Sequence, residues 1–392
     1  MNFVLFDDPA IRVDLMPFTL TRPVGSIRVG ILTIAEKWAT YTKGSVFYQT
    51  ADYLAEKFPG SPEPENLFIN GALCPDARMV EAVEALSTGE SLMHDGRLLA
   101  VKGSSAEVTT RKKEFGGTPV MIDQVWKIFQ VNGEELRSDF ELLTRGKKSH
   151  QITDPHTRAY SPEQIFIEEG VQLSACVLNA SAGPIYLGKH SQVQEGSVIR
   201  GPFSLGEDSV VNMGAKVRGD TTIGPHCKVG GEINNAVFFG YANKAHDGFL
   251  GNSVIGEWCN LGADTNTSNL KNNYADVKIW NYGKNGFQNT GLMFCGLMMG
   301  DHSKCGINTM FNTGTVTGVA SNIFGDGYPR TFIPSFAWGG AAGFSTNQLN
   351  RVFETAERAM GRRHVVLTET DKRILATIFE HTIAERVWEK KQ

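Results

Sequence analysis

Residues 187–229 decide the fold, and they read LGKHSQVQEGSVIRGPFSLGEDSVVNMGAKVRGDTTIGPHCKV. An aliphatic side chain recurs at every sixth position, and the series is Leu187, Val193, Ile199, Leu205, Val211, Val217, Ile223 and Val229. The repeat of an α-helix is about 3.6 residues and that of a strand about 2, so neither element explains this period. Small residues and glycines between the members suit tight corners. The pattern predicts a parallel β-helix in which each six-residue side places one aliphatic side chain in the core.

The same register resumes twice further along the chain. A second run is Phe249, Ile255, Leu261 and Thr267, and a third is Met293, Met299, Cys305, Phe311, Thr317 and Ile323. We expect Ile165, Val171 and Val177 to open the first coil. The polar stretch 269–290, NLKNNYADVKIWNYGKNGFQNT, cannot form a core side and is expected to leave the solenoid as a loop. Such a loop can cover a cleft beside the stack.

The sequence divides into three expected domains. Residues 1–155 alternate short apolar runs with helical patterns, which is typical of an α/β domain. Residues 156–340 carry the β-helix, and residues 341–392 show the periodicity of a helical tail. The expected strands of the first domain are 2–6, 66–69 and 98–101, its expected helices are 33–42 and 79–86, and those of the tail are 347–360 and 370–390.

Composition excludes several function classes. The formal net charge of −4 and a pI near 6.2 leave no basic surface of the kind that nucleic-acid binding needs. No apolar stretch reaches the roughly 18 residues of a membrane span, and the start MNFVLFDDP lacks the cationic lead of an export signal. The six cysteines form no C-x-x-C pair. We therefore expect a cytoplasmic protein with reduced thiols that binds neither nucleic acid nor membrane.

A second motif interrupts the repeat and carries chemistry. Residues 244–251 read KAHDGFLG, and Ile255-Gly256, Leu261-Gly262-Ala263 and Asn269 follow. This run resembles the K-A-G-H-x-x-Y-L-G, I-G, I-G-A-G and C-N-Y-D-G signature of the bifunctional glucosamine-1-phosphate acetyltransferase / N-acetylglucosamine-1-phosphate uridyltransferase family. The resemblance implies a left-handed β-helix with acetyl-CoA as cosubstrate. It implies His246 as general base, Ala263 at the thioester of acetyl-CoA, and Asn269 on the sugar phosphate.

The proposed base suits the reaction. A primary amine must lose a proton as it attacks a thioester, and imidazole is the side chain whose pKa fits that task near neutral pH. The resemblance also places Arg218 on the substrate phosphate. Asn234 stands where the family has a phosphate-binding Lys, Phe249 replaces its Tyr, and Asp264 replaces the second Gly of I-G-A-G. A lost cation and a lost hydroxyl leave the identity of the sugar open, and Lys278 in the looped stretch can supply a cation.

The histidines also raise a metal interpretation. Some hexapeptide-repeat proteins resemble γ-class carbonic anhydrases, which hold zinc with three His between subunits. His190, His226, His246 and His302 are scattered here and lack the closely spaced pair that such a site usually needs. The spacing therefore favours a metal-free acyltransferase over zinc hydration chemistry.

The first domain carries a second resemblance. Residues 15–24, LMPFTLTRPV, together with Arg28, Thr33 and Glu36-Lys37-Trp38, resemble a shortened sugar nucleotidyltransferase domain from an alternative branch of the same bifunctional family. The Gly-rich G-x-G-T-R loop of that domain is missing. Residues 6–12, FDDPAIR, cannot offer the permissive backbone that closes on a triphosphate. The side chains expected to hold the phosphates instead are Arg12, Arg22, Arg28 and Lys37, with structural salt bridges as the alternative.

A nucleotidyl transfer of this kind also needs a metal ion. Asp95 is a candidate ligand for the Mg²⁺ that accompanies the nucleoside triphosphate, because the metal needs an oxygen anion near the phosphates. The alternative for Asp95-Gly96 is a surface turn.

Three functional classes follow from these observations. The first is a sugar-nucleotide enzyme that acetylates an amino-sugar 1-phosphate on the β-helix and transfers a nucleotidyl group in the first domain. The second is an acyltransferase whose first domain only binds a sugar nucleotide, and the third is a non-catalytic trimeric scaffold. The family resemblance implies a homotrimer with acyl-donor sites between subunits.

Overall fold

The computed structural model describes residues 2–389 and contains two compact units. The N-terminal unit comprises Met1–Leu15, Thr21–Ile27 and Leu32–Gln124. The C-terminal unit comprises Met16–Leu20, Arg28–Ile31 and Val125–Gln392.

The N-terminal unit is built on a six-stranded mixed sheet in the order β2-β1-β3-β6-β5-β7. Its strands are β1 (Phe3–Phe6), β2 (Val46–Gln49), β3 (Asn66–Asn70), β5 (Glu90–His94), β6 (Arg97–Gly103) and β7 (Arg111–Glu114). The short strands β4 (Leu73–Cys74) and β8 (Val120–Met121) pair separately. The helices are α1 (Pro9–Asp14), α2 (Ile34–Thr42), α3 (Asp52–Ala55) and α4 (Ala77–Glu84), with the 3₁₀ turn η2 (Val24–Ser26). These elements confirm the expected α/β domain, and β1, β3, β6, α2 and α4 lie where the sequence predicts them.

The order of the parallel strands determines where a ligand can bind. β1 pairs in parallel with β2 on one side and with β3 on the other. The chain therefore passes from β1 to one neighbour and then crosses to the opposite side. Open α/β sheets bind ligands at such a switch point, beyond the carboxyl ends of the strands.

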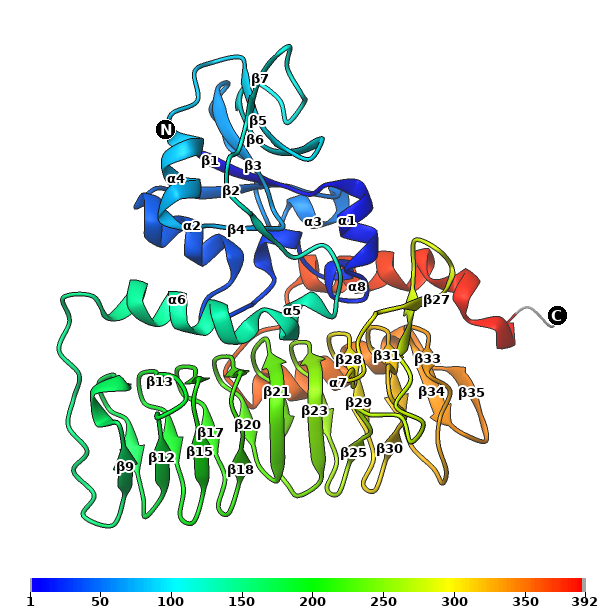
Figure 1. Ribbon diagram of the computed structural model, residues 1–392. Coiled ribbons are helices and arrows are strands. Elements are labelled where there is room, and N and C mark those ends of the chain that lie inside the picture. Colours follow the sequence, from blue (N-terminus) through cyan, green and yellow to red (C-terminus); the bar gives the residue numbers. More distant parts are fainter. Residues whose placement is uncertain (1, 390–392) are drawn as a thin grey trace. The chain divides into compact units, whose positions relative to one another are not determined.

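The C-terminal unit is the predicted left-handed parallel β-helix, and Figure 1 shows its coils stacked in chain order from β9 to β35. The 13-stranded sheet contains β9 (Arg158–Tyr160), β10 (Ile165–Ile167), β12 (Val177–Asn179), β13 (Ile185–Leu187), β15 (Val198–Arg200), β16 (Phe203–Leu205), β18 (Lys216–Val217), β19 (Thr221–Ile223), β21 (Glu232–Phe238), β23 (Phe249–Ile255), β28 (Met298–Met299), β31 (Val316–Thr317) and β33 (Phe332–Ile333). The 10-stranded sheet contains β11 (Gln172–Leu173), β14 (Gln192–Val193), β17 (Val210–Val211), β20 (Lys228–Val229), β22 (Asn243–Lys244), β24 (Asn260–Leu261), β29 (Lys304–Cys305), β32 (Asn322–Ile323), β34 (Ala337–Gly340) and β35 (Gly343–Thr346). A separate pair is β25 (Asn266–Thr267) with β30 (Met310–Phe311).

The register confirms the six-residue repeat. Val193 pairs with Val211 and Ile199 with Val217, so one coil of three sides spans 18 residues here. All eight members of the first run are buried, with exposed fractions of 2% or less. The aliphatic positions therefore form one continuous core along the solenoid.

The register of the other runs differs from expectation at three places. Leu250 is fully buried and pairs with Ile233, whereas Phe249 is only partly buried. Leu178 rather than Val177 faces the core of the opening coil, and Met293 is 44% exposed. The cause at Leu250 is a shorter coil: Val229 pairs with Lys244, 15 residues later, because the seven-residue strand β21 runs through a corner. After this coil the core positions therefore no longer follow the six-residue register of the first run.

The looped stretch leaves the solenoid as predicted. Within residues 269–290, β26 (Lys278–Asn281) and β27 (Gly286–Asn289) form an antiparallel hairpin outside the stack. The coil resumes at β28, and the pairing of Ile255 with Met299 spans the excursion.

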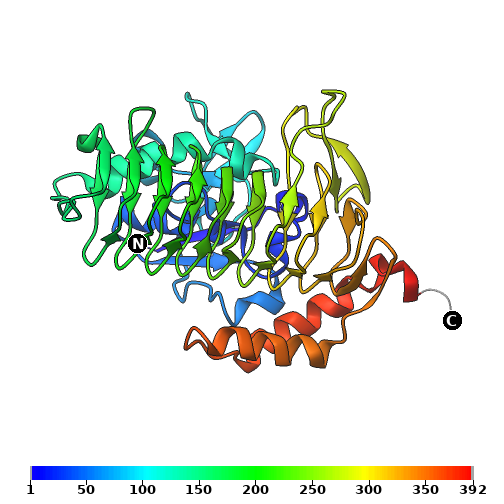
Figure 2. The same cartoon turned by 90° about the horizontal axis from the view of Figure 1, so that it is seen from below.

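Helices on the solenoid complete the C-terminal unit. They are α5 (Lys127–Gln130), α6 (Asn132–Thr144), α7 (Leu349–Gly361) and α8 (Glu369–His381), with the 3₁₀ turns η1 (Phe18–Leu20), η3 (Pro162–Gln164), η4 (Ile383–Glu385) and η5 (Val387–Glu389). Asn132 donates its Nδ2–H to the carbonyl of Asp220 at 2.8 Å, so α6 groups with the solenoid although the sequence assigns it to the first domain. Figure 2 shows α7 and α8 lying side by side along the coils, where Trp258 packs against Ala356 and Met360.

Candidate functional sites

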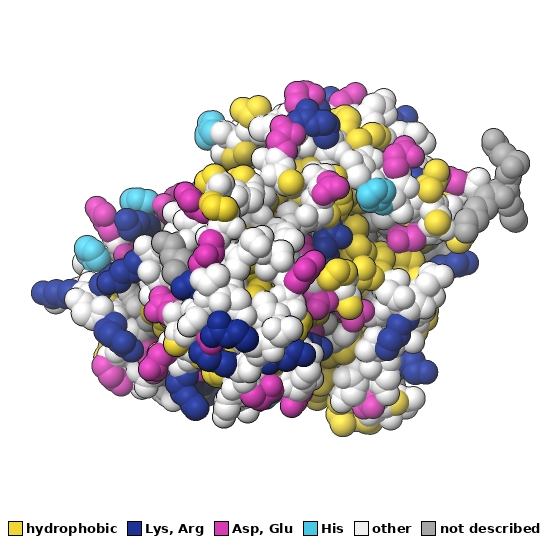
Figure 3. Space-filling model, turned by 90° about the horizontal axis from the view of Figure 1, so that it is seen from above, with side chains coloured by type: hydrophobic (Ala, Val, Ile, Leu, Met, Phe, Trp, Pro, Cys, Tyr) yellow, Lys and Arg dark blue, Asp and Glu magenta, His cyan; other side chains and the backbone are white. Residues whose placement is uncertain are grey.

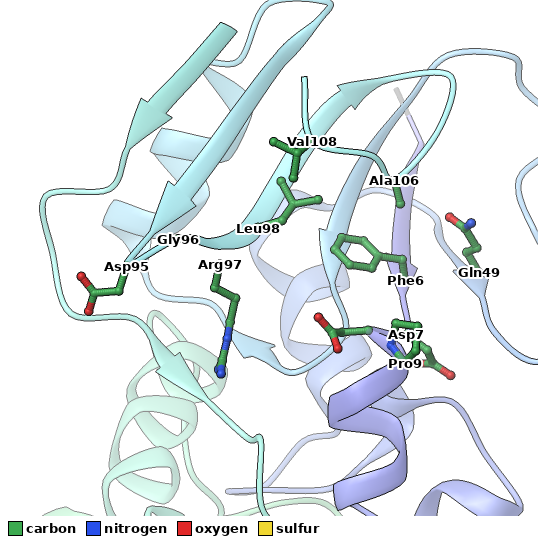
Figure 4. Close-up of a pocket in the computed structure, with 11 residues that line it drawn as sticks. Phe6, Asp7, Pro9, Gln49, Asp95, Gly96, Arg97, Leu98, Ala106 and Val108 are labelled. Carbon is green, nitrogen blue, oxygen red and sulfur yellow. The ribbon is translucent and has the colours of Figure 1, made fainter. Parts of the chain in front are cut away.

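The N-terminal unit has a cavity of about 680 Å³ at the switch point of its sheet. Residues at the carboxyl ends of β1 and β2 line it, together with the β5–β6 turn and the segment after β6 (Figure 4). Its volume suits a small-molecule ligand. The lining residues are Phe6, Asp7, Asp8, Pro9, Gln49, Asp95, Gly96, Arg97, Leu98, Ala106 and Val108.

Asp7, at the end of β1, is the most constrained polar group of this cavity. Its carboxylate accepts hydrogen bonds from the backbone N–H of Val24 at 2.8 Å and from Oγ1–H of Thr50 at 2.6 Å. Burial raises the pKa of Asp7, although these hydrogen bonds and Arg12 oppose the rise. Arg12 lies 3.4 Å from the carboxylate and donates to the hydroxyl of Tyr53 at 2.7 Å. The predicted phosphate ligand Arg12 is thus engaged with Asp7 and Tyr53 and does not line the cavity.

Asp8 occupies the place of the missing Gly-rich loop. Its carboxylate accepts from the backbone N–H of Ala10 at 2.9 Å and of Ile11 at 3.2 Å, and so caps α1. The amides that a phosphate-binding loop would present are therefore bound by a carboxylate of the chain itself. This follows from the sequence Asp7-Asp8-Pro9, which stands where the resemblance implies a Gly-rich loop.

The other predicted phosphate ligands of the first domain are buried. Arg22 is 6%, Arg28 9% and Lys37 1% exposed, and none lines the cavity. Arg28 donates from Nε to the carbonyl of Phe239 at 3.0 Å and from Nη1 to that of Ile31. Their role in phosphate binding stays a prediction.

Asp95 lies at the edge of the cavity, on the β5–β6 turn (Figure 4). One ligand atom each from Asp95, His94 and Glu114 lie within 4.8 Å of one another. Glu114 also accepts the backbone N–H of Asp95 at 3.0 Å, which joins β7 to the turn. Two carboxylates suit Mg²⁺, whereas an imidazole in the set suits Mn²⁺ or Zn²⁺ better. Asp95 therefore lies in a turn and also belongs to the group of possible metal ligands, so the structure is compatible with both interpretations of this residue.

The C-terminal unit has a cavity of about 540 Å³ along one corner of the solenoid. Its lining joins two predicted site residues, His246 and Ala263, which lie on successive coils. The corners stack through backbone hydrogen bonds, from Asp264 N–H to the Asp247 carbonyl at 3.1 Å and from Asn308 N–H to the Ala263 carbonyl at 2.8 Å. The lining residues are Gln194, Asn212, Met213, Gly231, Ala245, His246, Asp247, Ala263 and Asp264.

Gly248 explains why the motif needs a glycine after His246-Asp247. Its φ of +109° lies in a region that side chains rarely adopt, and an added Cβ would stand 2.2 Å from the carbonyl oxygen of Thr265. Only glycine therefore lets this corner approach the next coil closely enough to place His246 beside Ala263.

The other predicted substrate ligands lie elsewhere. The pairing of Val217 with Ile233 places Arg218 next to Asn234, and Asn234 in turn pairs with Gly251. Arg218 forms an ion pair with Glu232 at 3.0 Å. This group lies beside the first half of β23, the strand that starts after His246. Asn269 donates to Oδ1 of Asn252 at 2.8 Å, and Lys278 is exposed on β26.

Sequence reasoning missed several residues of the His246 cavity. Asn212 and Gln194 lie two and three coils before Ala245, and Asn212 donates its Nδ2–H to the carbonyl of Ala245 at 2.8 Å. The signal was available, because both sit just after a core aliphatic residue and so at the same corner of the repeat. His190, His226 and His302 lie at a different corner, where their backbones stack on Glu169, Glu207 and Glu257.

Charge and hydropathy of the surface add two observations. On the face shown in Figure 3, Lys and Arg side chains are mixed with Asp and Glu, and no extended patch of one sign is visible. Within residues 2–389, no helix has the length and apolar character needed to cross a membrane.

Comparisons with known proteins bear mainly on the first domain. Among solved structures, a UDP-N-acetylglucosamine acyltransferase of Arabidopsis is 16% identical, covering 61% of this chain and 96% of that chain at a TM-score of 0.26. The UDP-N-acetylglucosamine acyltransferase of Campylobacter jejuni is 14% identical, covering 59% and 96% at a TM-score of 0.17. TM-scores this low support no conclusion about function, and no curated protein matches the chain. The Sugar nucleotidyl transferase family model matches residues 3–148, so this part of the chain is similar to sugar nucleotidyl transferases.

Proposed function

We propose that the protein is a sugar-nucleotide biosynthesis enzyme with one reaction in each unit. The β-helix N-acetylates an amino-sugar 1-phosphate with acetyl-CoA, and the first domain transfers a nucleotidyl group to a sugar 1-phosphate, giving a product similar to UDP-N-acetylglucosamine. The observation that carries the first reaction is the shared cavity of His246 and Ala263. The family match over residues 3–148 supports the second.

In the acyl transfer, His246 acts as general base. The amine nitrogen of the sugar attacks the thioester carbon while Nε2 or Nδ1 of His246 accepts the amine proton, and the CoA thiolate leaves and takes up a proton. The backbone at Ala263 meets the acyl group. Arg218, Asn234, Asn269 and Lys278 are proposed to contact the sugar phosphate.

In the nucleotidyl transfer, the sugar phosphate oxygen attacks the α-phosphorus of the nucleoside triphosphate and pyrophosphate leaves. The cavity beyond β1 and β2 is the proposed nucleotide site. Asp95, with His94 and Glu114, has ligand atoms suited to the divalent cation that neutralises the phosphates. Arg12, Arg22, Arg28 and Lys37 remain the proposed cationic contacts.

A homotrimer completes the proposal. The His246 cavity lies open along one solenoid corner, and a neighbouring copy packed against that corner would enclose acyl-CoA. The expected mass is three times 42.9 kDa. A strictly monomeric mass at micromolar concentration would contradict a site shared between subunits.

A second candidate function follows from Asp8. Because Asp8 caps α1 and three carboxylates line the cavity, the first domain has the features of a module that binds a sugar nucleotide without cleaving a triphosphate. In this case the protein is an acyltransferase only.

One experiment separates these functions. Acetyl-CoA, glucosamine 1-phosphate and each common nucleoside triphosphate are supplied with Mg²⁺, and free CoA and pyrophosphate are measured separately. CoA release that His246→Ala abolishes supports the acyl transfer. Release of CoA without pyrophosphate, together with binding of a UDP-sugar, favours the second candidate, and release of neither product contradicts both.

A further inference from the structure

A lysine occupies a core position of the solenoid directly beneath the His246 corner. Lys244 on β22 pairs with Val229, which pairs in turn with Val211, so it continues a column of valines. Its side chain is 1% exposed. Burial lowers the pKa of Lys244 to about 8, although the charges of Asp247 and Asp264 oppose the shift. A buried ammonium at an aliphatic position is costly, so the contacts that it makes need an explanation.

These contacts all go to the turn that carries His246. The Nζ of Lys244 donates to the carbonyl of His246 at 2.6 Å and to that of Asp247 at 3.1 Å. The preceding carbonyl, of Ala245, accepts from Asn212. Three successive carbonyls of the corner are therefore held by side chains that reach them from the solenoid.

The His246 ring itself has no such support. Across residues 2–389, no hydrogen bond or ion pair of its imidazole is found, and the residue is exposed. A general base is ordinarily oriented by a third group. Here the orientation must come from the backbone of the turn.

We infer that Lys244 is a positioning residue for His246, because it holds the two carbonyls that set the direction in which the imidazole enters the cavity. This inference rests on the proposed acyl transfer. Lys244 itself is buried, so its role in the reaction is indirect and is exerted through His246.

The chain offers a matched control in Lys304. Its Nζ donates to the carbonyls of Trp258 and His302, both at 3.2 Å, and burial lowers its pKa as well. These carbonyls belong to a different corner, away from His246. Replacing Lys304 removes the same kind of contact without touching the His246 turn.

The test compares Lys244→Met, Lys304→Met and His246→Ala by CoA release. Misplacing a reacting group by about 1 Å costs up to roughly 100-fold in rate, so we expect kcat of Lys244→Met to fall by about 10- to 100-fold with little change in KM. Lys304→Met should keep wild-type kcat. In the His246→Ala background, Lys244→Met should cause no further loss, because a residue that acts through His246 has nothing left to position.

Two outcomes must be told apart. If His246→Ala keeps full CoA release, the proposed acyl transfer fails. If His246→Ala is inactive but Lys244→Met behaves like Lys304→Met, the inference about Lys244 is overturned and the acyl transfer stands. The NMR signal of the His246 ring, assigned by its loss in His246→Ala, gives a readout independent of activity: it should shift or broaden in Lys244→Met only. Should that variant not fold, Lys244→Leu replaces it, since Leu261 holds this position in the next coil.

Discussion

Replacing Lys244 by Met is expected to change how the stability of the C-terminal unit depends on pH. Burial lowers the pKa of Lys244 from 10.5 to about 8. Between these values the unfolded chain carries the proton and the folded chain does not, so the free energy of unfolding rises with pH. For one group with these two pKa values, the gain between pH 7 and pH 9.5 is about 2 kcal/mol. A methionine has no proton to lose, so the variant lacks this gain.

The measurement is guanidinium unfolding followed by circular dichroism at pH 7 and pH 9.5. The free energy of wild type minus that of Lys244→Met should increase by about 2 kcal/mol between the two pH values. Loss of the two hydrogen bonds to His246 and Asp247 lowers the free energy of unfolding of the variant by the same amount at both pH values, so it cancels in this comparison. Lys278→Met, at an exposed position of β26, is the control and should show no such increase. A wild-type minus Lys244→Met difference that is the same at both pH values would refute the description of Lys244 as a buried ammonium.

Three further results are expected. His246→Ala should lower CoA release by roughly 100- to 10,000-fold while the circular dichroism spectrum stays unchanged, and wild-type turnover would contradict its role as base. Gly248→Ala should lower the free energy of unfolding in urea by roughly 2–4 kcal/mol, because of the positive φ and the nearby Thr265 carbonyl. The control Gly214→Ala, whose added Cβ meets nothing, should lower it by about 1 kcal/mol. Equal losses would argue against a close approach at Gly248. Asp95→Ala should raise the Mg²⁺ or Mn²⁺ concentration for half-maximal pyrophosphate formation about tenfold or more, and an unchanged activation curve would remove Asp95 from the metal site.

The β-helix was predictable because its sequence pattern involves only residues that are close together in the chain. One aliphatic residue per six-residue side determines which side chains face inward, so the run from Leu187 to Val229 specifies its own coils. The same logic places the hairpin of β26 and β27 outside the stack, since polar residues cannot fill a core side. Prediction failed at Phe249, where the shorter coil around β21 moves Leu250 into the core. The sequence shows that the repeat loses its register between Val229 and Phe249, but it does not show which side chain enters the core afterwards.

The candidate sites were predictable only in part. His246 and Ala263 lie in one cavity because successive coils stack corner on corner, and a repeat known to be about 18 residues long already implies that neighbourhood. The positions of the cations expected to bind phosphate in the first domain could not be predicted in this way. Arg28 is 9% and Lys37 is 1% exposed, and a sequence motif does not report whether a cation faces a cavity or lies in a core.

Periodicity by itself determined the architecture of this protein: a solenoid from the six-residue repeat, an α/β domain before it and two helices after it. These properties depend on which side chains must leave water, and neighbours in sequence specify that. Only the tertiary structure decided that Asp7, Asp8 and Asp95 line one cavity, and that Lys244 binds the carbonyls of the His246 turn. Burial and hydrogen bonding of a polar side chain depend on atoms contributed by distant strands and coils, which no local pattern contains.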